Sequence, residues 1–238
     1  MTDVPRSQPV IVMRNVGIYY WLKKGYLRRE RFWALKDVSL ELHRGEALGV
    51  IGRNGAGKTT LLQLLAGIIS PDRGELENAG VQAAMLSLQI GFLDQLSGRE
   101  NAILGGLMLG ISKSVVENKM EDIVSFSELG DFFDRPLGTY SSGMKARLGL
   151  SVALQLDPDV LLIDEVMGVG DAEFRAKSEA CMIERVKSNR TIVLVSHNSH
   201  TIRQLCDRAV WIEKGRSLTE GPTEEVIQAY EASLRKEG

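Results

Sequence analysis

The segment Gly52–Thr59, GRNGAGKT, restricts the possible folds of this chain more than any other feature. It fits the pattern G-x-x-x-x-G-K-[ST] at every fixed position. Glycines in such a loop let backbone N–H groups turn inward around phosphate oxygens. Lys58 supplies a positive charge for the β- and γ-phosphates, and the Thr59 hydroxyl is the expected Mg²⁺ ligand. The residues that we expect to hold the phosphates are Gly52, Asn54, Gly55, Ala56, Gly57, Lys58, Thr59 and Thr60.

The flanking sequence has the context that this loop needs. The apolar run Glu46–Ile51 predicts a buried strand before it. After it, a helix is predicted whose positive end would face the bound anion. The apolar face of that helix is expected to comprise Leu61, Leu62, Leu64, Leu65 and Ile68. A chance match in a glycine-rich turn is the alternative, and the flanking strand and helix disfavour it.

The composition is that of an ordinary globular protein. Of 238 residues, 44% are hydrophobic, which excludes intrinsic disorder. The formal net charge of −2 argues against a dedicated nucleic-acid-binding protein, which usually carries a basic excess. Two cysteines are too few for a disulfide-stapled fold. No apolar run approaches the roughly 20 residues that span a bilayer, and residues 1–9 lack the apolar stretch of a secretory signal. We therefore expect a cytoplasmic protein with reduced thiols.

Hydrophobic patterning predicts the remaining elements. Strands are expected at 10–16, 34–42, 160–163 and 192–195, and a helix at 171–187. The two later strands are continuous apolar runs, so a parallel sheet buried on both faces is expected. The region from Ser97 to Leu156 is mainly helical in pattern, and Ser97 with Glu100 fits a capping box at its start. Residues 208–213 are predicted to form the first strand of a hairpin, and Pro222 is expected to open a last helix.

Two acids follow the apolar strand 160–163. Asp164 would lie at the carboxyl end of that strand, where the Mg²⁺ of a phosphate-loop enzyme sits. Glu165 comes next and could act as the general base for an attacking water. A solvated acidic strand cap is the alternative, and the phosphate loop in the same chain makes it the weaker interpretation.

Four further features resemble the ATPases of the ABC (ATP-binding cassette) family. Tyr140–Met144 (YSSGM) resembles the family's signature motif, usually LSGGQ. His197, in Val-Ser-His, is similar to the switch histidine. Asp171 matches the aspartate of the loop after the catalytic glutamate, and Tyr20 matches the aromatic residue that stacks on adenine. The resemblance covers roughly residues 10–230.

This resemblance implies an α/β fold, namely a P-loop NTPase cassette with a mixed sheet core and an N-terminal antiparallel β region. A helical subdomain, at about residues 92–157, would be inserted in a single ATPase domain spanning 1–238. ATP and Mg²⁺ would be the cofactors, and Lys58, Glu165 and His197 the catalytic residues. Two cassettes would meet head to tail as a homodimer. Each ATP would then lie between one subunit's Lys58 loop and the other's signature, where Ser141 and the Gly143 N–H meet the γ-phosphate.

Three positions leave alternatives open. Ser142 and Met144 depart from the usual signature, although Ser141 and Gly143 are kept. Gln89 is the natural candidate for the family's Mg²⁺-sensing glutamine, yet a gapless count back from Glu100 lands on Leu88. Gln89 could instead be an ordinary polar residue at a strand end. Tyr20 could be packed in the sheet, since the adjacent Tyr19 is equally aromatic.

Several segments look like the cassettes of polysaccharide exporters, which serve O-antigen, capsule and teichoic-acid glycans. These segments are 32–38, 96–101, 140–147, 164–174 with Val166 in place of the usual proline, and 205–209. The resemblance implies an ATP-hydrolysing subunit at the cytoplasmic face of the bacterial inner membrane, bound peripherally. It would move a lipid-linked polysaccharide through a separate transmembrane permease, without a nucleic-acid partner.

Alternatives are another transported substrate or a soluble ABC machine. A DNA-acting machine would carry a long coiled coil between Lys58 and Asp164, and none is present in the sequence. A non-hydrolysing regulator would lack Glu165 or His197. We expect the permease to dock on 92–131. The basic and aromatic segment 21–33 either lies near the membrane or forms a solvated hairpin. About forty residues follow His197, too few for the glycan-binding domain that some relatives append.

Overall fold

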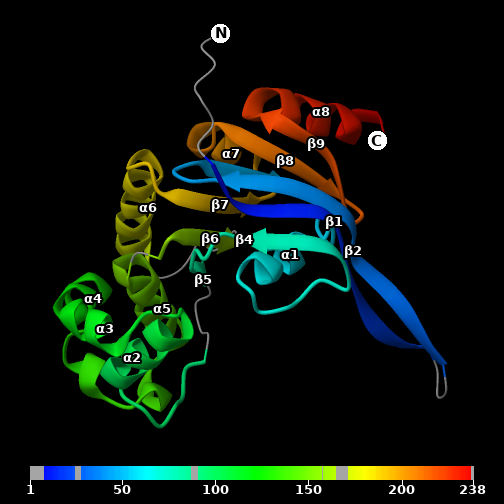
Figure 1. Cartoon of the computed structure of the whole chain (residues 1–238). Coiled ribbons are helices and arrows are strands. Elements are labelled where there is room, and N and C mark those ends of the chain that lie inside the picture. The colour runs from blue at the N-terminus through cyan, green and yellow to red at the C-terminus, as the bar shows by residue number, and fades with distance from the viewer. Residues whose placement is uncertain (1–7, 25–27, 87–90, 157, 165–170, 237–238) are drawn as a thin grey trace. The chain divides into compact units, whose positions relative to one another are not determined.

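A computed structural model describes residues 8–24, 28–86, 91–156, 158–164 and 171–236. The chain forms two compact units, one made of residues 1–81 with 189–238 and the other of residues 82–188 (Figure 1). Each unit has its own sheet strands and helices. Among the described residues, no helix is both long enough and apolar enough to cross a membrane.

The first unit is built on a mixed sheet with the strand order β4-β1-β2-β9-β8-β3-β7. Its N-terminal strands pair antiparallel, whereas β3 pairs parallel with both β7 and β8. The strands are β1 (Pro9–Lys24), β2 (Arg28–His43), β3 (Ala47–Ile51), β4 (Arg73–Asn78), β7 (Thr191–Ser196), β8 (Arg208–Glu213) and β9 (Arg216–Pro222). The helices are α1 (Lys58–Leu65), α7 (Ser199–Leu205) and α8 (Thr223–Lys236). The predicted antiparallel region and mixed core are therefore both present.

The second unit combines two parallel strands with helices. The strands are β5 (Ala83–Leu86) and β6 (Val160–Asp164). The helices are α2 (Gly98–Met108), α3 (Lys113–Asn118), α4 (Met120–Ser127), α5 (Ser142–Leu156) and α6 (Ala172–Lys187), with 3₁₀ turns at Gly130–Asp134 and Leu137–Thr139. The capping box at the start of α2 is confirmed. The Ser97 N–H donates to Glu100 Oε2 at 2.8 Å, and the Glu100 N–H donates to Ser97 Oγ at 3.2 Å.

Two predictions about helix boundaries were wrong. Ile68 does not belong to the buried face of α1, because the helix ends at Leu65 and Ile68 is 57% exposed. Gly67, with φ of +69°, turns the chain out of the helix; its N–H donates to Leu64 O, and the Ile68 N–H donates to Gln63 O. This double bond pattern is a Schellman ending, which places Ile68 outside the helix.

Pro222 does not open the last helix either. It is the final residue of β9, opposite Arg208, and α8 begins at Thr223. The Thr223 N–H donates to Asp207 O at 3.0 Å and its Oγ1 donates to Cys206 O at 2.6 Å. These two bonds hold the start of α8 against the turn that precedes β8.

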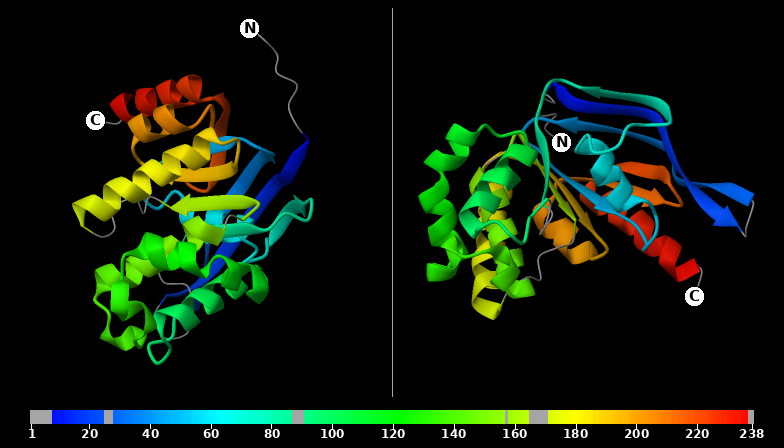
Figure 2. Two further views of the ribbon diagram at one scale, coloured as in Figure 1. Left: turned by 90° about the vertical axis from the view of Figure 1, so that its left-hand side faces the viewer. Right: turned by 90° about the horizontal axis from the view of Figure 1, so that it is seen from below.

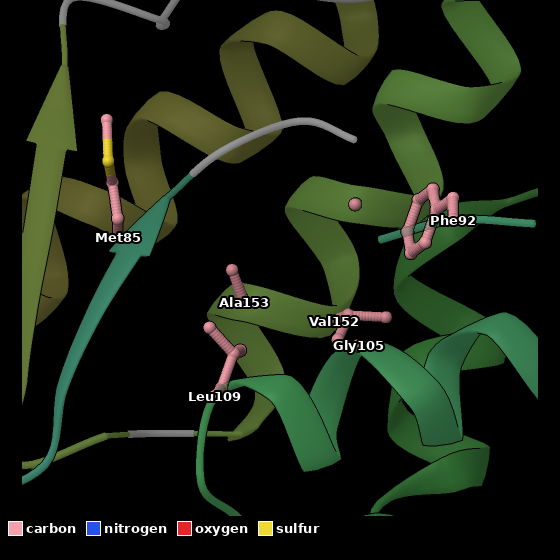
Figure 3. Close-up of a pocket in the computed structure, with 7 residues that line it drawn as sticks. Met85, Phe92, Gly105, Leu109, Val152 and Ala153 are labelled. Carbon is pink, nitrogen blue, oxygen red and sulfur yellow. The ribbon is translucent and has the colours of Figure 1, made fainter. Parts of the chain in front are cut away.

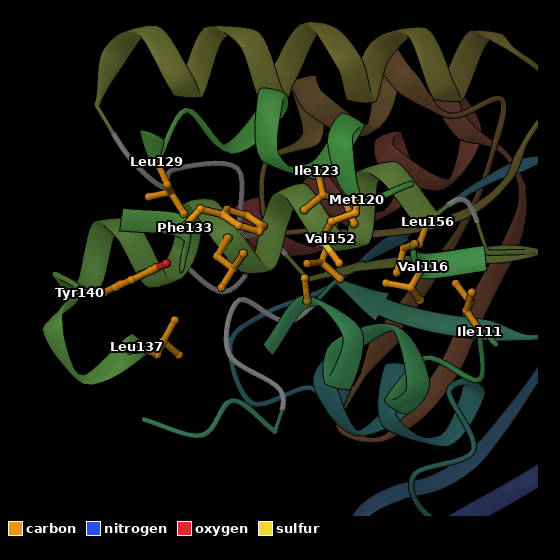
Figure 4. Packing of buried hydrophobic residues seen from close by; sticks show 12 residues of the cluster. Ile111, Val116, Met120, Ile123, Leu129, Phe133, Leu137, Tyr140, Val152 and Leu156 are labelled. Carbon is orange, nitrogen blue, oxygen red and sulfur yellow. The ribbon is translucent and has the colours of Figure 1, made fainter. Parts of the chain in front are cut away.

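The helices of the second unit enclose their own apolar core (Figure 4). The buried members that Figure 4 labels are Ile111, Val116, Met120, Ile123, Leu129, Phe133, Leu137, Tyr140, Val152 and Leu156. They come from α3, α4, α5, the segment after α2 and the turns between α4 and α5, so one cluster joins all of these elements. Phe133, at 1% exposure, is among the largest fully buried side chains.

We expect Phe133→Ala to lower the free energy of unfolding by about 3–5 kcal/mol, since it removes a buried ring and leaves a cavity. Urea denaturation measures the loss. The matched control is Phe132→Ala, because the neighbouring ring is 38% exposed; that change should cost far less. Equal losses from the two substitutions would show that the cluster does not hold the helical unit together.

Candidate functional site

The phosphate loop connects β3 to α1 in the first unit. All five residues of β3 are buried, and Ile51 is the last of them. The chain leaves the sheet at Gly52, and α1 begins at Lys58 with Gly57 as its N-cap. The loop therefore lies at the carboxyl end of a buried strand and at the positive end of a helix, both of which favour anion binding.

Glycines are needed in this loop because neighbouring strands approach its backbone closely. A Cβ on Gly52 would lie 2.1 Å from the Ile212 carbonyl oxygen, on β8. A Cβ on Gly57 would lie 2.6 Å from the Ala34 carbonyl oxygen, on β2, and its φ is +106°. The loop is thus held between two strands that are far apart in the sequence, and its shape is fixed before any ligand arrives.

Lys58 is buried, at 8% exposure, and its Nζ lies within the loop. It donates to Gly52 O at 2.8 Å and to Arg53 O at 3.0 Å. The Ala56 N–H closes a turn on Arg53 O at 3.1 Å. These bonds fix a positive charge inside a ring of backbone groups, and a polyphosphate of a nucleotide fits such a cradle.

His197 lies at the same edge of the sheet as the loop. Ile51 and Ser196 are register partners in the parallel pair β3–β7, so Gly52 and His197 leave the sheet side by side. The Ser196 Oγ accepts from the Asn198 N–H at 3.0 Å, and Asn198 in turn caps α7. His197 is exposed between these two anchored residues. This placement supports the predicted γ-phosphate role of His197.

The adenine-stacking role of Tyr20 stays a prediction, and the ring has the required exposure. Tyr20 is 41% exposed, opposite Phe32 on β2. Tyr19, by contrast, is packed, with its ring 5.3 Å from that of Trp33. Of the two adjacent aromatics, Tyr19 is the one that packs along the sheet.

The second unit holds the acidic strand end. Asp164 is the last residue of β6, after four buried residues. Glu165 and Gln89 lie outside the described residues, so their roles as base and Mg²⁺ ligand stay predictions. Among the described residues, no group of three or more His, Cys, Asp and Glu forms a metal site. Thr59 of the first unit and Asp164 of the second also stay predictions as Mg²⁺ ligands.

The signature residues are fixed at the start of α5. Tyr140 is buried in the helical core and donates from its Oη to Phe132 O at 2.6 Å. This burial raises the pKa of Tyr140 to about 12, so the hydroxyl remains a donor. Ser141 follows, exposed, and its Oγ accepts from the Met144 N–H at 3.2 Å. A buried anchor thus presents Ser141 and Gly143 at the positive end of a 15-residue helix.

Asp171 lies near the signature in the same unit. It caps α6 by accepting from the Phe174 N–H at 3.0 Å, and it also pairs with Arg147 of α5. The Phe174 N–H and the Arg147 guanidinium both lower the pKa of the Asp171 carboxyl. Ser141, Gly143 and Asp171 line one open hollow of about 460 Å³.

Sequence reasoning missed Arg147, which links these parts. Its guanidinium lies 4.6 Å from the centre of the Phe174 ring and pairs with both Asp171 and Glu128, the second at 3.4 Å. Lys177 adds a 2.5 Å ion pair to Glu128, which lowers the pKa of that carboxyl. The available signal was spacing, because Arg147 lies four residues after Gly143 and so one turn along the same helix face.

A second, apolar hollow lies between β5, α2 and α5 (Figure 3). It is lined by Met85, Phe92, Gly105, Leu109, Gly149, Val152 and Ala153. Its volume of about 20 Å³ is far too small for a nucleotide. This hollow therefore has no room for a nucleotide, and the phosphate loop stays the predicted nucleotide site.

Comparison with known proteins assigns the family. Residues 35–168, more than half of the chain, match the ABC transporter family. The chain belongs to this family. It is a nucleotide-binding cassette that hydrolyses ATP, as the phosphate loop indicates.

Curated relatives show which members of the family this chain resembles. The chain is 45% identical to the O-antigen export system ATP-binding protein RfbB of Klebsiella pneumoniae, over 87% of this chain and 85% of that protein. It is 44% identical to the RfbB protein of Myxococcus xanthus, over 97% of this chain and 57% of that one. It is 46% identical to the teichoic acids export ATP-binding protein TagH of Lactococcus lactis, over 84% of this chain and 43% of that protein. The resemblance to polysaccharide exporters is confirmed.

Solved structures confirm the fold. The ATP-binding subunit of an ABC transporter superposes with a TM-score of 0.74 at 23% identity, over 93% of each chain. A dimeric ATP-binding cassette in a post-hydrolysis state, bound to ADP and Pi, gives 0.71 at 21% identity, over 90% of this chain and 98% of that one. The predicted α/β cassette is therefore correct.

We expect Gly57→Ala to abolish measurable ATP binding and to lower the free energy of unfolding by about 1–3 kcal/mol. The added methyl group would press on Ala34 O and displace the loop. Titration with ATP and urea denaturation measure the two effects. Gly67→Ala is the matched control, since φ is also positive there but no atom lies within 4 Å of an added Cβ. ATP binding by the Gly57 variant that equals the control's would contradict the role of this close approach.

Proposed function

We propose that this chain is the ATP-hydrolysing subunit of an ABC exporter that moves a lipid-linked polysaccharide of the O-antigen, capsule or teichoic-acid type across the cytoplasmic membrane. The observation that carries this proposal is the 45% identity to an O-antigen export ATP-binding protein over most of both chains. The preformed phosphate loop supplies the chemistry that such a subunit needs. Export of another substrate is the alternative that the experiment below addresses.

The two units together would form one ATPase domain, and two copies of the chain would bind two ATP molecules between them. Gly143 supports this arrangement. A Cβ at this position would meet only Ser141 Oγ, at an ordinary 3.8 Å, so the chain itself has room for a side chain. Glycine in the first turn of a helix is less favourable than alanine by up to about 1 kcal/mol. The absence of a side chain is therefore best explained by a group from outside, and the γ-phosphate held by a partner copy fits there.

The catalytic assignments follow from this arrangement. Lys58 would hold the β- and γ-phosphates, and His197 would contact the γ-phosphate from the adjacent strand. Thr59, Asp164 and Gln89 would hold Mg²⁺, which neutralises charge on the phosphates when bound. Glu165 would take the proton of the attacking water. Asp171, which caps the N-terminus of α6, would lie beside the signature at the interface between the copies.

A separate permease would dock on the helical region 92–131, and the chain would then lie peripherally at the cytoplasmic face of the membrane. The described part of this region exposes several large apolar side chains, which favours a protein interface. They are Leu93 at 42%, Leu107 at 48%, Met108 at 54% and Val115 at 45% exposure. We propose no nucleic-acid partner.

We expect Glu165→Gln to bind ATP without hydrolysing it and to elute as a dimer in gel filtration when ATP is present. The amide cannot accept the water's proton, so the sandwiched state persists. Adding Gly143→Ala to this variant should return it to a monomer while leaving its thermal stability unchanged or raised. A Glu165→Gln protein that stays monomeric with ATP, or a double variant that still dimerises, would argue against the shared site.

Purification from membranes tests the transport role. We expect the tagged chain to be recovered with a multi-spanning membrane subunit and with glycan-assembly enzymes. Cells without the chain should lose a surface glycan, and the wild-type gene should restore it whereas Lys58→Ala should not. Recovery only with ribosomes or DNA, or an unchanged surface glycan, would overturn the proposed function.

A further inference from the structure

Strands β1 and β2 continue beyond the sheet as a two-stranded ribbon, which we define as residues 19–24 and 28–33. Its base is fixed where Gly17 pairs with Arg73 of β4 and Asp37 pairs with Arg216 of β9. From Tyr19 onward the described pairings of β1 are with β2 alone, and the last joins Lys24 to Arg28. Figures 1 and 2 show the ribbon, in blue, projecting from the strands of its own unit.

One face of the ribbon carries aromatic rings packed edge to face and an arginine. The Tyr19 ring lies 5.6 Å from Trp21 and 5.3 Å from Trp33, both edge to face. The Arg31 guanidinium lies over Tyr19 at 4.8 Å and over Trp21 at 5.2 Å. An isolated two-stranded ribbon is marginally stable in water, and this stack stiffens it. Trp21 still exposes 52% of its surface.

The opposite face is also apolar. Leu22 and Phe32 are 50% and 51% exposed. Alternation along the strands places these two side chains on the face that does not carry Trp21. The Lys24–Glu30 ion pair, at 2.7 Å, lies beyond them toward the tip. Both faces of the ribbon therefore present large apolar side chains to solvent.

The ribbon is basic within an acidic chain. Residues 19–33 contain five Lys and Arg against a single Glu, whereas the whole chain has a formal net charge of −2. Lys23, Arg29 and Arg31 are all exposed. The long aliphatic stems of such residues can lie along apolar groups while their charged ends stay in a polar layer.

We propose that the ribbon is a membrane-contact surface, which lies in the headgroup layer of an anionic lipid bilayer. Aromatic rings favour this layer, and Lys and Arg side chains are attracted by anionic headgroups. A groove on a protein partner covers one face of a ribbon, whereas a headgroup layer surrounds it. The exposure of apolar groups on both faces, interleaved with cations, therefore favours lipid. The surface is separate from the nucleotide loop, and the proposal holds whatever substrate the exporter moves.

The test uses the purified full chain and vesicles of phosphatidylcholine with or without phosphatidylglycerol, measured by co-sedimentation. The chain should bind the anionic vesicles, and added salt should weaken the binding because it screens the charges. The wild-type Trp fluorescence should shift to the blue on binding, and Trp21→Phe should remove most of that shift. Equal binding to vesicles without anionic lipid, or no binding to either, would overturn the proposal.

Variants locate the contact. Replacing Lys23, Lys24 and Arg29 by Gln should weaken vesicle binding about a hundredfold, since each basic residue near an anionic surface contributes about fivefold. The matched control replaces Lys113, Lys119 and Lys187, which are also exposed, and should bind as the wild type does. Leu22→Ser with Phe32→Ser should bind more weakly and lose the blue shift. A ribbon variant that binds like the control would contradict the proposal.

Two further measurements distinguish a bilayer contact from loss of the ATPase and from recognition of a single phosphate group. All of these variants should keep the basal ATPase activity, so that failure of vesicle binding and failure of the ATPase are distinguishable. Inorganic pyrophosphate, at matched ionic strength, should leave vesicle binding unchanged. Displacement by pyrophosphate would mean that the ribbon recognises a discrete phosphate group, and this result would overturn a bilayer-surface contact.

Discussion

The close approach of the phosphate loop to two neighbouring strands is the constraint on which the nucleotide site depends. The Ile212 carbonyl of β8 and the Ala34 carbonyl of β2 leave no room for a Cβ on Gly52 or Gly57. The same strands belong to the sheet that carries β3 into the loop, so folding the sheet also shapes the loop. Lys58 is then tied inward by two loop carbonyls. A ligand meets a cradle that is already formed, which lowers the entropic cost of binding.

Helix α5 organises the second unit in a comparable way. Its first residues carry the signature, Tyr140 anchors them in the apolar core, and Arg147 reaches Asp171 and Glu128. Each pair on its own is a partly exposed contact of modest strength. Together they join α4, α5 and α6 around the hollow that Ser141 and Gly143 line. The parts of the site that would face a partner copy are therefore held by the helical core and not by the ligand.

Much of this could be predicted from the sequence. The phosphate-loop and strand-end patterns predicted roles for Lys58, Thr59 and Asp164, and the family resemblance predicted one for His197. Apolar runs located the strands that carry these residues, because strand burial is encoded in neighbouring residues. Local patterning also explains why Ile68 and Pro222 were misassigned. The apolar side chain of Ile68 suits the buried face of a helix, but the Schellman turn at Gly67 ends the helix before it. The ring of Pro222 suits the first turn of a helix, but Pro222 pairs with β8 as part of β9. The link from Arg147 to Asp171 joins residues 24 apart and left only a spacing signal.

The sequence by itself determined that this chain binds a nucleotide phosphate and belongs among ABC cassettes, because the phosphate loop and the signature motif are each short runs of consecutive residues. Only the tertiary structure decided which glycines are sterically required, which of Tyr19 and Tyr20 is packed, and that residues 19–24 and 28–33 form a ribbon with two apolar faces. Each of these depends on atoms brought together from distant positions. Packing between such positions sets how much of a side chain is exposed and how much space an added Cβ would have. No local sequence pattern encodes either quantity.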